Sequence, residues 1–157
     1  NKLLIPSITF DHEKEHLEEL GVPYEIIKTD LTCLGNNILA TDKAAIINPE
    51  FTEQEKELLE EALGVPCIRK EIMDIEAIGG IGVARKGKGL FHRDLHPETV
   101  KELERTLGLD ITLGTVNMGS PYIKSGIRLG EEGFLVGNTS GGPEIRNADE
   151  ALGFIEG

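Results

Sequence analysis

Four short segments share one pattern and decide the fold of this chain: Glu19–Val22 (ELGV), Ala62–Val65 (ALGV), Thr106–Leu109 (TLGL) and Ala151–Phe154 (ALGF). Their glycines recur every 43 to 45 residues, at positions 21, 64, 108 and 153. Fifteen residues before each glycine, a short apolar run has just ended, at Pro6, Pro49, Arg93 and Asn138. A constant offset inside a nearly constant period indicates that one supersecondary unit is repeated along the chain. The sequence therefore predicts a repeat protein.

Each copy is expected to hold two strands joined by a hairpin, then a helix and a closing strand. Helices are predicted over 11–20, 52–63, 97–107 and 143–152, each followed by a recurrent glycine suited to the left-handed residue after a helix. Residues 52–55 (TEQE) match a capping box, which strengthens the second helix start. Strands are predicted over 3–5, 22–28, 37–41, 44–48, 65–71, 82–85, 89–92, 111–116, 127–129 and 134–137. The copies divide the chain into a partial repeat 1–35, repeats 36–79 and 80–124, and a partial repeat 125–157.

The composition limits the classes of function. The chain has 157 residues, 39% of them hydrophobic, and a net charge of −12. Its size fits a single domain with a real core, and its apolar runs are far too short to span a membrane. Nucleic-acid binders neutralise phosphates with cationic side chains, so an acidic chain is a poor DNA binder and suits a basic protein partner better. Cys33 and Cys67 have neither metal-site nor disulfide-framework spacing, so we expect a cytoplasmic protein without metal or cofactor.

Small residues occupy one equivalent position in successive copies. Thirteen residues before Pro49, Arg93 and Asn138 stand Asn36, Gly80 and Ser125. Such a series is what a crowded central axis would require, because only small side chains fit where several strands start close together. The pattern favours copies arranged radially over copies stacked in a line.

Longer motifs resemble a known family. They are Leu34–Asn36 (LGN), Ile47–Pro49 (INP), Gly114–Ser120 (GTVNMGS), Gly133–Gly137 (GFLVG), Gly142–Ile145 (GPEI) and Glu150–Gly153 (EALG). In this order they resemble the translation initiation factor 6 family, with features of its archaeal members, over essentially the whole chain. One departure is Asn138–Pro143 (NTSGGP), which replaces paired threonines of the family pattern.

The resemblance implies a fold. Members of that family form the pentein fold, a closed ring of five ββαβ repeats around a pseudo-fivefold axis. Against that ring, this chain begins about one and a half repeats late and lacks the N-terminal strand that shuts the ring. We therefore expect an α/β repeat protein whose ring is incomplete, with strand edges left unpaired.

The resemblance also implies a function without catalysis. Family members bind the large ribosomal subunit on the face that meets the small subunit, mainly through a ribosomal protein near the sarcin-ricin loop of the RNA, and so prevent subunit joining. The residues expected to take part in docking are Gly35, Asn36, Asp42, Gly80, Asn117 and Ser125. Turn geometry is an equal explanation for each, since turn glycines and asparagines often serve backbone conformations with positive φ. A cationic turn with Arg85, Lys86 and Lys88 is a possible contact with ribosomal RNA, and a solubilising turn is the alternative.

Two other functions remain open from the residues. Enzymes that modify guanidino groups share the pentein fold, and the chain supplies the residue types that they use: Cys33, Cys67, His92, Asp94 and His96. A reactive cysteine needs a nearby base or a lowered pKa, and the repeat spacing spreads these residues apart. We therefore interpret Cys67 as a buried strand residue and the histidines as capping or packing residues. A non-catalytic repeat scaffold is the other alternative.

Overall fold

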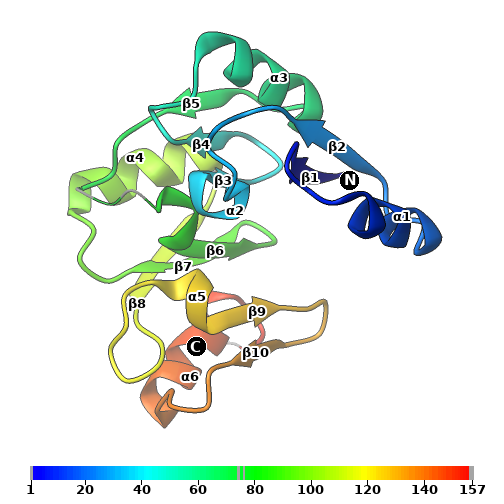
Figure 1. Ribbon diagram of the computed structural model, residues 1–157. Helices are drawn as coiled ribbons and strands as arrows, with labels where there is room; N and C mark the ends of the chain where they lie inside the picture. The colour runs from blue at the N-terminus through cyan, green and yellow to red at the C-terminus, as the bar shows by residue number, and fades with distance from the viewer. Residues whose placement is uncertain (1, 74, 76, 156–157) are drawn as a thin grey trace.

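The computed structural model describes residues 2–73, 75 and 77–155, which form small sheets and helices that follow one another along the chain (Figure 1). The strands are β1 (Leu3–Pro6), β2 (Tyr24–Ile27), β3 (Ile38–Ala40), β4 (Ala45–Ile47), β5 (Cys67–Arg69), β6 (Gly82–Arg85), β7 (Lys88–His92), β8 (Asp110–Gly114), β9 (Ile127–Leu129) and β10 (Phe134–Val136). The helices are α1 (Asp11–Glu19), α2 (Leu34–Asn37), α3 (Glu53–Leu63), α4 (Pro97–Leu107), α5 (Ile123–Gly126) and α6 (Gly142–Ala151), with a 3-10 turn η1 (Ile78–Gly80). The mixed α/β character expected from the sequence is confirmed.

The two central sheets have the same strand order. In β3-β4-β5, the first pair is antiparallel and the second parallel, with Ile46 opposite Leu39 and Ile68. In β6-β7-β8 the order and directions are the same, with Leu90 opposite Val83 and Thr112. We call β3, β4, α3 and β5 the second unit, and β6, β7, α4 and β8 the third unit. Each has the predicted hairpin, helix and closing strand, and the structure shows that the closing strand runs parallel to its neighbour.

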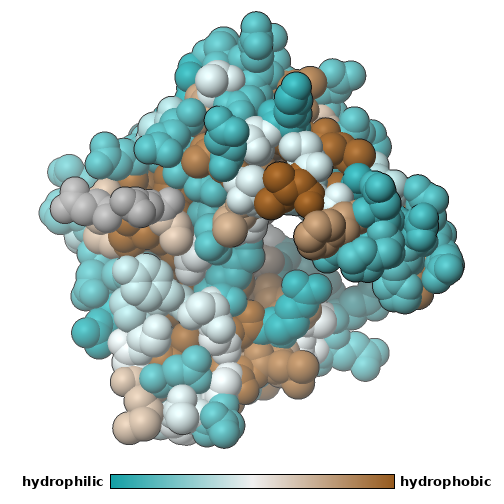
Figure 2. Space-filling model, viewed as in Figure 1, coloured by the Kyte–Doolittle hydropathy of each residue, from teal (hydrophilic) through white to brown (hydrophobic). Residues whose placement is uncertain are grey.

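The sheets at the two ends contain fewer strands within the described residues. In the N-terminal unit (β1, α1 and β2) the two strands are parallel, and in the C-terminal unit (β9, β10 and α6) they are antiparallel. The units lie around an arc whose ends are the N-terminal and C-terminal units (Figure 1). Figure 2 shows a hollow between these ends, with hydrophobic side chains over β9 and β10 beside it; Leu135 of β10 is 76% exposed.

Helix ends follow the local chemistry expected from the sequence. The four recurrent glycines have φ between 65° and 71°, the left-handed region in which a side chain is strained: Gly21, Gly64, Gly108 and Gly153. Thr52 begins α3 with the predicted capping box, in which its hydroxyl accepts the Glu55 amide and Glu55 accepts the Thr52 amide. The recurrent segment thus ends one helix in each unit.

The core is shared between neighbouring units. Alternate residues of β4 point to opposite sides, so that Ala45 and Ile47 join the cluster beneath α3, while Ile46 joins the cluster beneath α4. In β7, Phe91 packs in the cluster beneath α4, and Leu90 packs in a third cluster beneath α6. Each central sheet is therefore covered on both faces, which explains why its strands are short continuous apolar runs.

Hairpin turns of one unit complete helix ends of the next. The Thr41 hydroxyl, in the β3–β4 turn, donates to the Leu107 carbonyl at 2.9 Å, and Lys43 Nζ donates to the Arg105 carbonyl at 3.2 Å, both in the last turn of α4. Arg85, at the β6–β7 turn, donates to the carbonyl of Leu152 after α6 at 3.4 Å. Carbonyls that a helix leaves unpaired at its C-terminus are thus satisfied from the preceding unit.

Several strands are shorter than predicted, whereas β6 and β9 have the predicted bounds and β1 and β7 are one residue longer. The closing strand predicted over 111–116 ends at Gly114, and Val116 instead forms a single bridge with Ser120. Between the strands predicted over 22–28 and 37–41 the chain forms the short helix α2, in which the Asn37 side chain donates to the Cys33 carbonyl at 3.0 Å and closes a helical turn. No helix in the described part of the chain is long and apolar enough to cross a membrane.

Candidate functional site

Three short helical turns from successive positions along the arc surround one hollow. They are α2, η1 and α5, which precede β3, β6 and β9. The hollow has a volume of about 500 Å³ and is lined by Gly35, Asn36, Ala77, Gly80, Tyr122, Lys124 and Ser125. We call it the central hollow. It brings together four of the six residues predicted to take part in docking.

Lys124 ties two sides of the central hollow together. Its Nζ donates to the Gly35 carbonyl at 2.9 Å, which joins α5 to α2 across 89 residues of sequence. Burial, with a smaller contribution from the like charge of Arg128, lowers the pKa of Lys124. On the same rim, the Ser125 hydroxyl donates to the Tyr122 carbonyl at 2.7 Å. The hollow is therefore held by specific polar contacts.

Backbone geometry does not account for the small residues that line the hollow. Gly35, Asn36 and Gly80 all lie outside the positive-φ region, so the turn explanation does not apply to them. A Cβ on Gly35 or Gly80 would meet its nearest neighbour at 3.9 or 3.7 Å, which is ordinary contact. Gly79 is different, because a Cβ there would overlap the backbone of Gly35 and Ile38. Steric need explains Gly79, but the exposed positions Gly35 and Asn36 remain free to serve a surface role.

Asn117 lies in another part of the structure and has a structural role. Its φ is 51°, and its backbone N–H donates to the Ser140 hydroxyl at 2.9 Å. Its Oδ1 accepts the Thr139 hydroxyl at 3.1 Å. A Cβ on Gly126 or Gly137 would overlap the Asn117 side chain, so both glycines make room for it. For Asn117 the turn explanation applies.

Asp42 and the cationic turn border a second hollow. Asp42, Arg85 and Lys86 are among the residues that line a volume of about 330 Å³ between the β3–β4 and β6–β7 turns. The Arg85 guanidinium lies 4.0 Å from the centre of the Phe154 ring and donates to the Glu131 carbonyl at 2.7 Å, so it is already occupied within the chain. Lys86 and Lys88 are exposed. The structure thus separates Asp42 from the central hollow and places it beside the cations.

Glu144 is a polar centre that sequence analysis did not single out, although it lies within the GPEI motif. Its carboxylate accepts the Thr115 hydroxyl at 2.7 Å and the backbone amides of Gly119 at 2.8 Å, Gly141 at 2.9 Å and Met118 at 3.1 Å. These hydrogen bonds, with that of Thr115 the largest, lower the pKa of Glu144 from 4.5 to about 2. The residue fastens the GTVNMGS loop to the start of α6. Its long-range partners could not be inferred from a single motif.

The residues considered for catalysis have structural surroundings. Burial, with a smaller contribution from Glu60, raises the pKa of the Cys67 thiol to about 11, which suppresses the nucleophilic thiolate. His96 caps α4, where its Nδ1 accepts the Glu98 amide at 3.4 Å. His92 is buried, its Nδ1 accepts the Asp94 amide at 3.2 Å, and desolvation lowers its pKa. Among the described residues, no group of three or more His, Cys, Asp or Glu could hold a metal ion.

Comparison with known proteins places the chain in a family. A profile of the eIF-6 family matches residues 1–151. Translation initiation factor 6 of Saccharolobus solfataricus is 42% identical over 158 residues, covering 98% of this chain and 70% of the relative. The proteins of the same name from Saccharolobus islandicus and Thermococcus onnurineus are 40% and 37% identical, covering 98% and 99% of this chain and 70% and 71% of those relatives. The chain therefore belongs to the eIF-6 family, whose relatives named here are archaeal translation initiation factors.

Proposed function

We propose that this chain is a translation factor that binds the large ribosomal subunit and prevents its association with the small subunit, without catalytic activity of its own. The observation that carries the proposal is the match over nearly the whole chain to archaeal proteins named translation initiation factor 6. The surroundings of Cys67, His92 and His96 give the competing enzyme function no support. The proposed place of action is the cytoplasm, where ribosomal subunits meet.

The proposed docking surface is the rim of the central hollow. Around it lie Gly35, Asn36, Gly80 and Ser125. The first three do not have positive φ, so backbone conformation does not require a glycine or asparagine there. A basic ribosomal protein near the sarcin-ricin loop is the proposed partner, because a chain with a net charge of −12 attracts a partner of opposite sign. Lys86 and Lys88 are the proposed contacts with ribosomal RNA.

The proposed architecture is an incomplete pentein ring made of the repeats 1–35, 36–79, 80–124 and 125–157. Two observations support it. The central units share one strand order, and the units follow an arc with the equivalent turns α2, η1 and α5 near its centre (Figure 1). In this architecture the central hollow lies on the pseudo-fivefold axis.

Co-sedimentation tests the proposed function and its surface together. The chain is mixed with purified archaeal large subunits, small subunits and joined ribosomes across a series of salt concentrations. We expect selective binding to free large subunits. Asn36→Arg, on the rim, should weaken this binding by about tenfold or more, whereas Glu57→Arg, at another exposed position on α3, should change it little. Absence of binding by the chain at low salt would contradict the function; equal binding by both variants would contradict the surface.

A further inference from the structure

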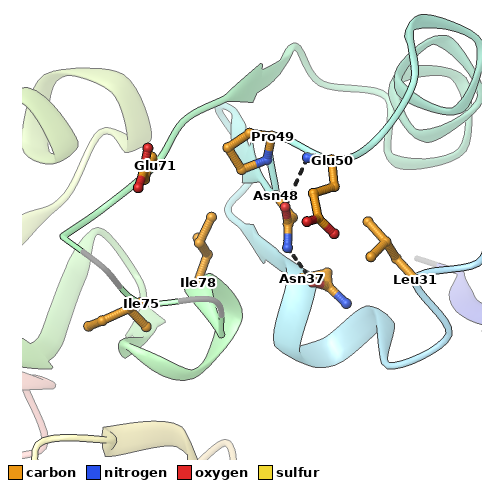
Figure 3. A pocket seen from close by; sticks show the side chains of 8 residues that line it. All are labelled: Leu31, Asn37, Asn48, Pro49, Glu50, Glu71, Ile75 and Ile78. Atoms are coloured by element: carbon orange, nitrogen blue, oxygen red, sulfur yellow. Dashed lines mark hydrogen bonds between the residues drawn. The ribbon is translucent and has the colours of Figure 1, made fainter.

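A third pocket borders the same α2 and η1 turns as the central hollow but has its own lining residues, beside the start of β3 and the end of β4 (Figure 3). Its volume is about 590 Å³, within the range of binding sites for small ligands and side chains. It is lined by Leu31, Asn37, Asn48, Pro49, Glu50, Glu71, Ile75 and Ile78, none of which lines the central hollow. We call it the lateral pocket.

Two buried amides form a fixed polar part of the lateral pocket. Asn37 and Asn48 are 9% and 8% exposed. Asn48 Nδ2 donates to Asn37 Oδ1 at 2.8 Å, and Asn48 Oδ1 accepts the Glu50 amide at 2.9 Å (Figure 3). The bond from Asn37 Nδ2 to the Cys33 carbonyl completes the chain of contacts. These bonds fix which end of each amide is oxygen; each Oδ1 keeps a second lone pair for another donor, and each Nδ2 keeps a second N–H for another acceptor.

Two carboxylates flank this polar part. Glu50 follows β4, and Glu71 lies on the opposite side of Asn48 in the close view (Figure 3). Both residues are exposed, and neither forms an ion pair with any residue that the structure describes. The acceptors of the pocket are therefore two carboxylates and two amide oxygens, and no ion pair within the described residues neutralises the two negative charges.

The rest of the lining is apolar. Ile78 is buried, and Leu31 and Ile75 are half-buried on either side of the amides. A ligand that matches this lining carries N–H donors and a positive charge at its tip, and methylene groups behind it. Arginine has this form, because its planar guanidinium presents five N–H donors on an apolar stem, and charge-assisted bonds to carboxylates are the strong ones.

We propose that the lateral pocket binds an arginine side chain of a basic partner protein, through the carboxylates of Glu50 and Glu71. The inference rests on the proposed function for the expectation that the partner is a basic ribosomal protein, and it adds a second point of contact beyond the central hollow. The net charge of −12 gives the long-range attraction, and the lateral pocket gives the local recognition of one cationic side chain.

A titration of the isolated chain tests the pocket without the ribosome. The ¹⁵N-labelled chain is titrated with Nα-acetyl-arginine amide and, separately, with Nα-acetyl-citrulline amide, a neutral analogue of nearly the same shape. We expect the arginine compound to shift the side-chain amide signals of Asn37 and Asn48, and the citrulline compound to bind at least about tenfold more weakly.

A matched pair of variants identifies the carboxylates. Glu50→Gln combined with Glu71→Gln should weaken arginine binding by about tenfold or more, because the charge of both acceptors is lost while their shape is kept. Glu57→Gln combined with Glu61→Gln removes the same charge from exposed positions of α3 and should leave the binding unchanged. Equal shifts by both compounds, or equal losses in both double variants, would overturn the inference. If the titration fails while the chain still co-sediments with large subunits, the lateral pocket is excluded and the proposed function stands.

Discussion

Replacement of Glu144 by glutamine tests the polar centre that joins the GTVNMGS loop to α6. The carboxylate accepts four hydrogen bonds, three of them from backbone amides. In Glu144→Gln, one oxygen becomes an NH₂ group, which cannot accept the amides that it would face. The variant keeps the length and shape of the side chain, so the effect isolates the loss of acceptors.

The size of the effect follows from the pKa of Glu144. A decrease from 4.5 in the unfolded chain to about 2 in the folded protein would correspond to about 3 kcal/mol at about 1.4 kcal/mol per unit. The side chain is only partly buried, and solvent screening reduces this to about 1–2 kcal/mol. Because the folded pKa is the lower one, this stabilisation is complete above about pH 5 and is lost as the pH falls from 4.5 towards 2.

Urea unfolding followed by far-ultraviolet circular dichroism measures the stabilisation by Glu144 and its dependence on pH. At pH 7 we expect Glu144→Gln to lower the free energy of unfolding by about 1–2 kcal/mol, and at pH 3 by less than half of that amount. Glu132→Gln, an exposed position in the same unit, serves as the control and should change stability by less than about 0.5 kcal/mol. A difference that is the same at pH 3 and pH 7 would refute the account of the carboxylate.

Three further predictions concern packing, helix ends and the cysteines. Gly137→Ala should lower the free energy of unfolding by about 1–3 kcal/mol, because its methyl group overlaps the Asn117 side chain; in an Asn117→Gly background urea unfolding should show less than half of that cost, and an undiminished cost would contradict the overlap. Thr41→Val should cost about 1 kcal/mol in the same assay, because a carbonyl at the end of α4 loses its donor, and a neutral result would show that water replaces it. Iodoacetamide at pH 8, followed by mass spectrometry, should label the exposed Cys33 more than about a hundredfold faster than Cys67, whose pKa is about 11, and ribosome binding should survive the labelling; similar rates would contradict the burial of Cys67.

Features of the fold that depend on local chemistry could be predicted from the sequence. The capping box at Thr52 and the left-handed glycines at Gly64 and Gly108 involve contacts within one helical turn, so their residues identify them directly. The lengths of β5 and β8 are overestimated from the sequence, because the apolar pattern continues past the point where the partner strand ends. Pairing, which sequence alone does not show, sets the limits of β5 and β8.

The candidate site could be predicted only where the repeats indicated that residues distant in sequence occupy equivalent positions near one axis. Asn36, Gly80 and Ser125 occupy one position of successive units, and the structure gathers them at one hollow. Asp42 carries no such equivalence and lies in a different hollow. The stacking of Arg85 on Phe154 and the placement of Glu50 and Glu71 at the lateral pocket bring together residues that are distant in sequence, for which no local pattern exists.

The helix ends completed by the preceding unit couple the local stabilities of neighbouring units. Opening of the β3–β4 turn removes Thr41 from the end of α4, 66 residues away, and exposes that helix end to fraying. Fraying of α4 destabilises the turn by the same coupling free energy, although the turn keeps its own backbone bond from Thr41 to the Ala44 carbonyl at 2.9 Å. Amide hydrogen exchange should therefore be correlated between the β3–β4 turn and the last turn of α4, and Thr41→Val should accelerate exchange at both.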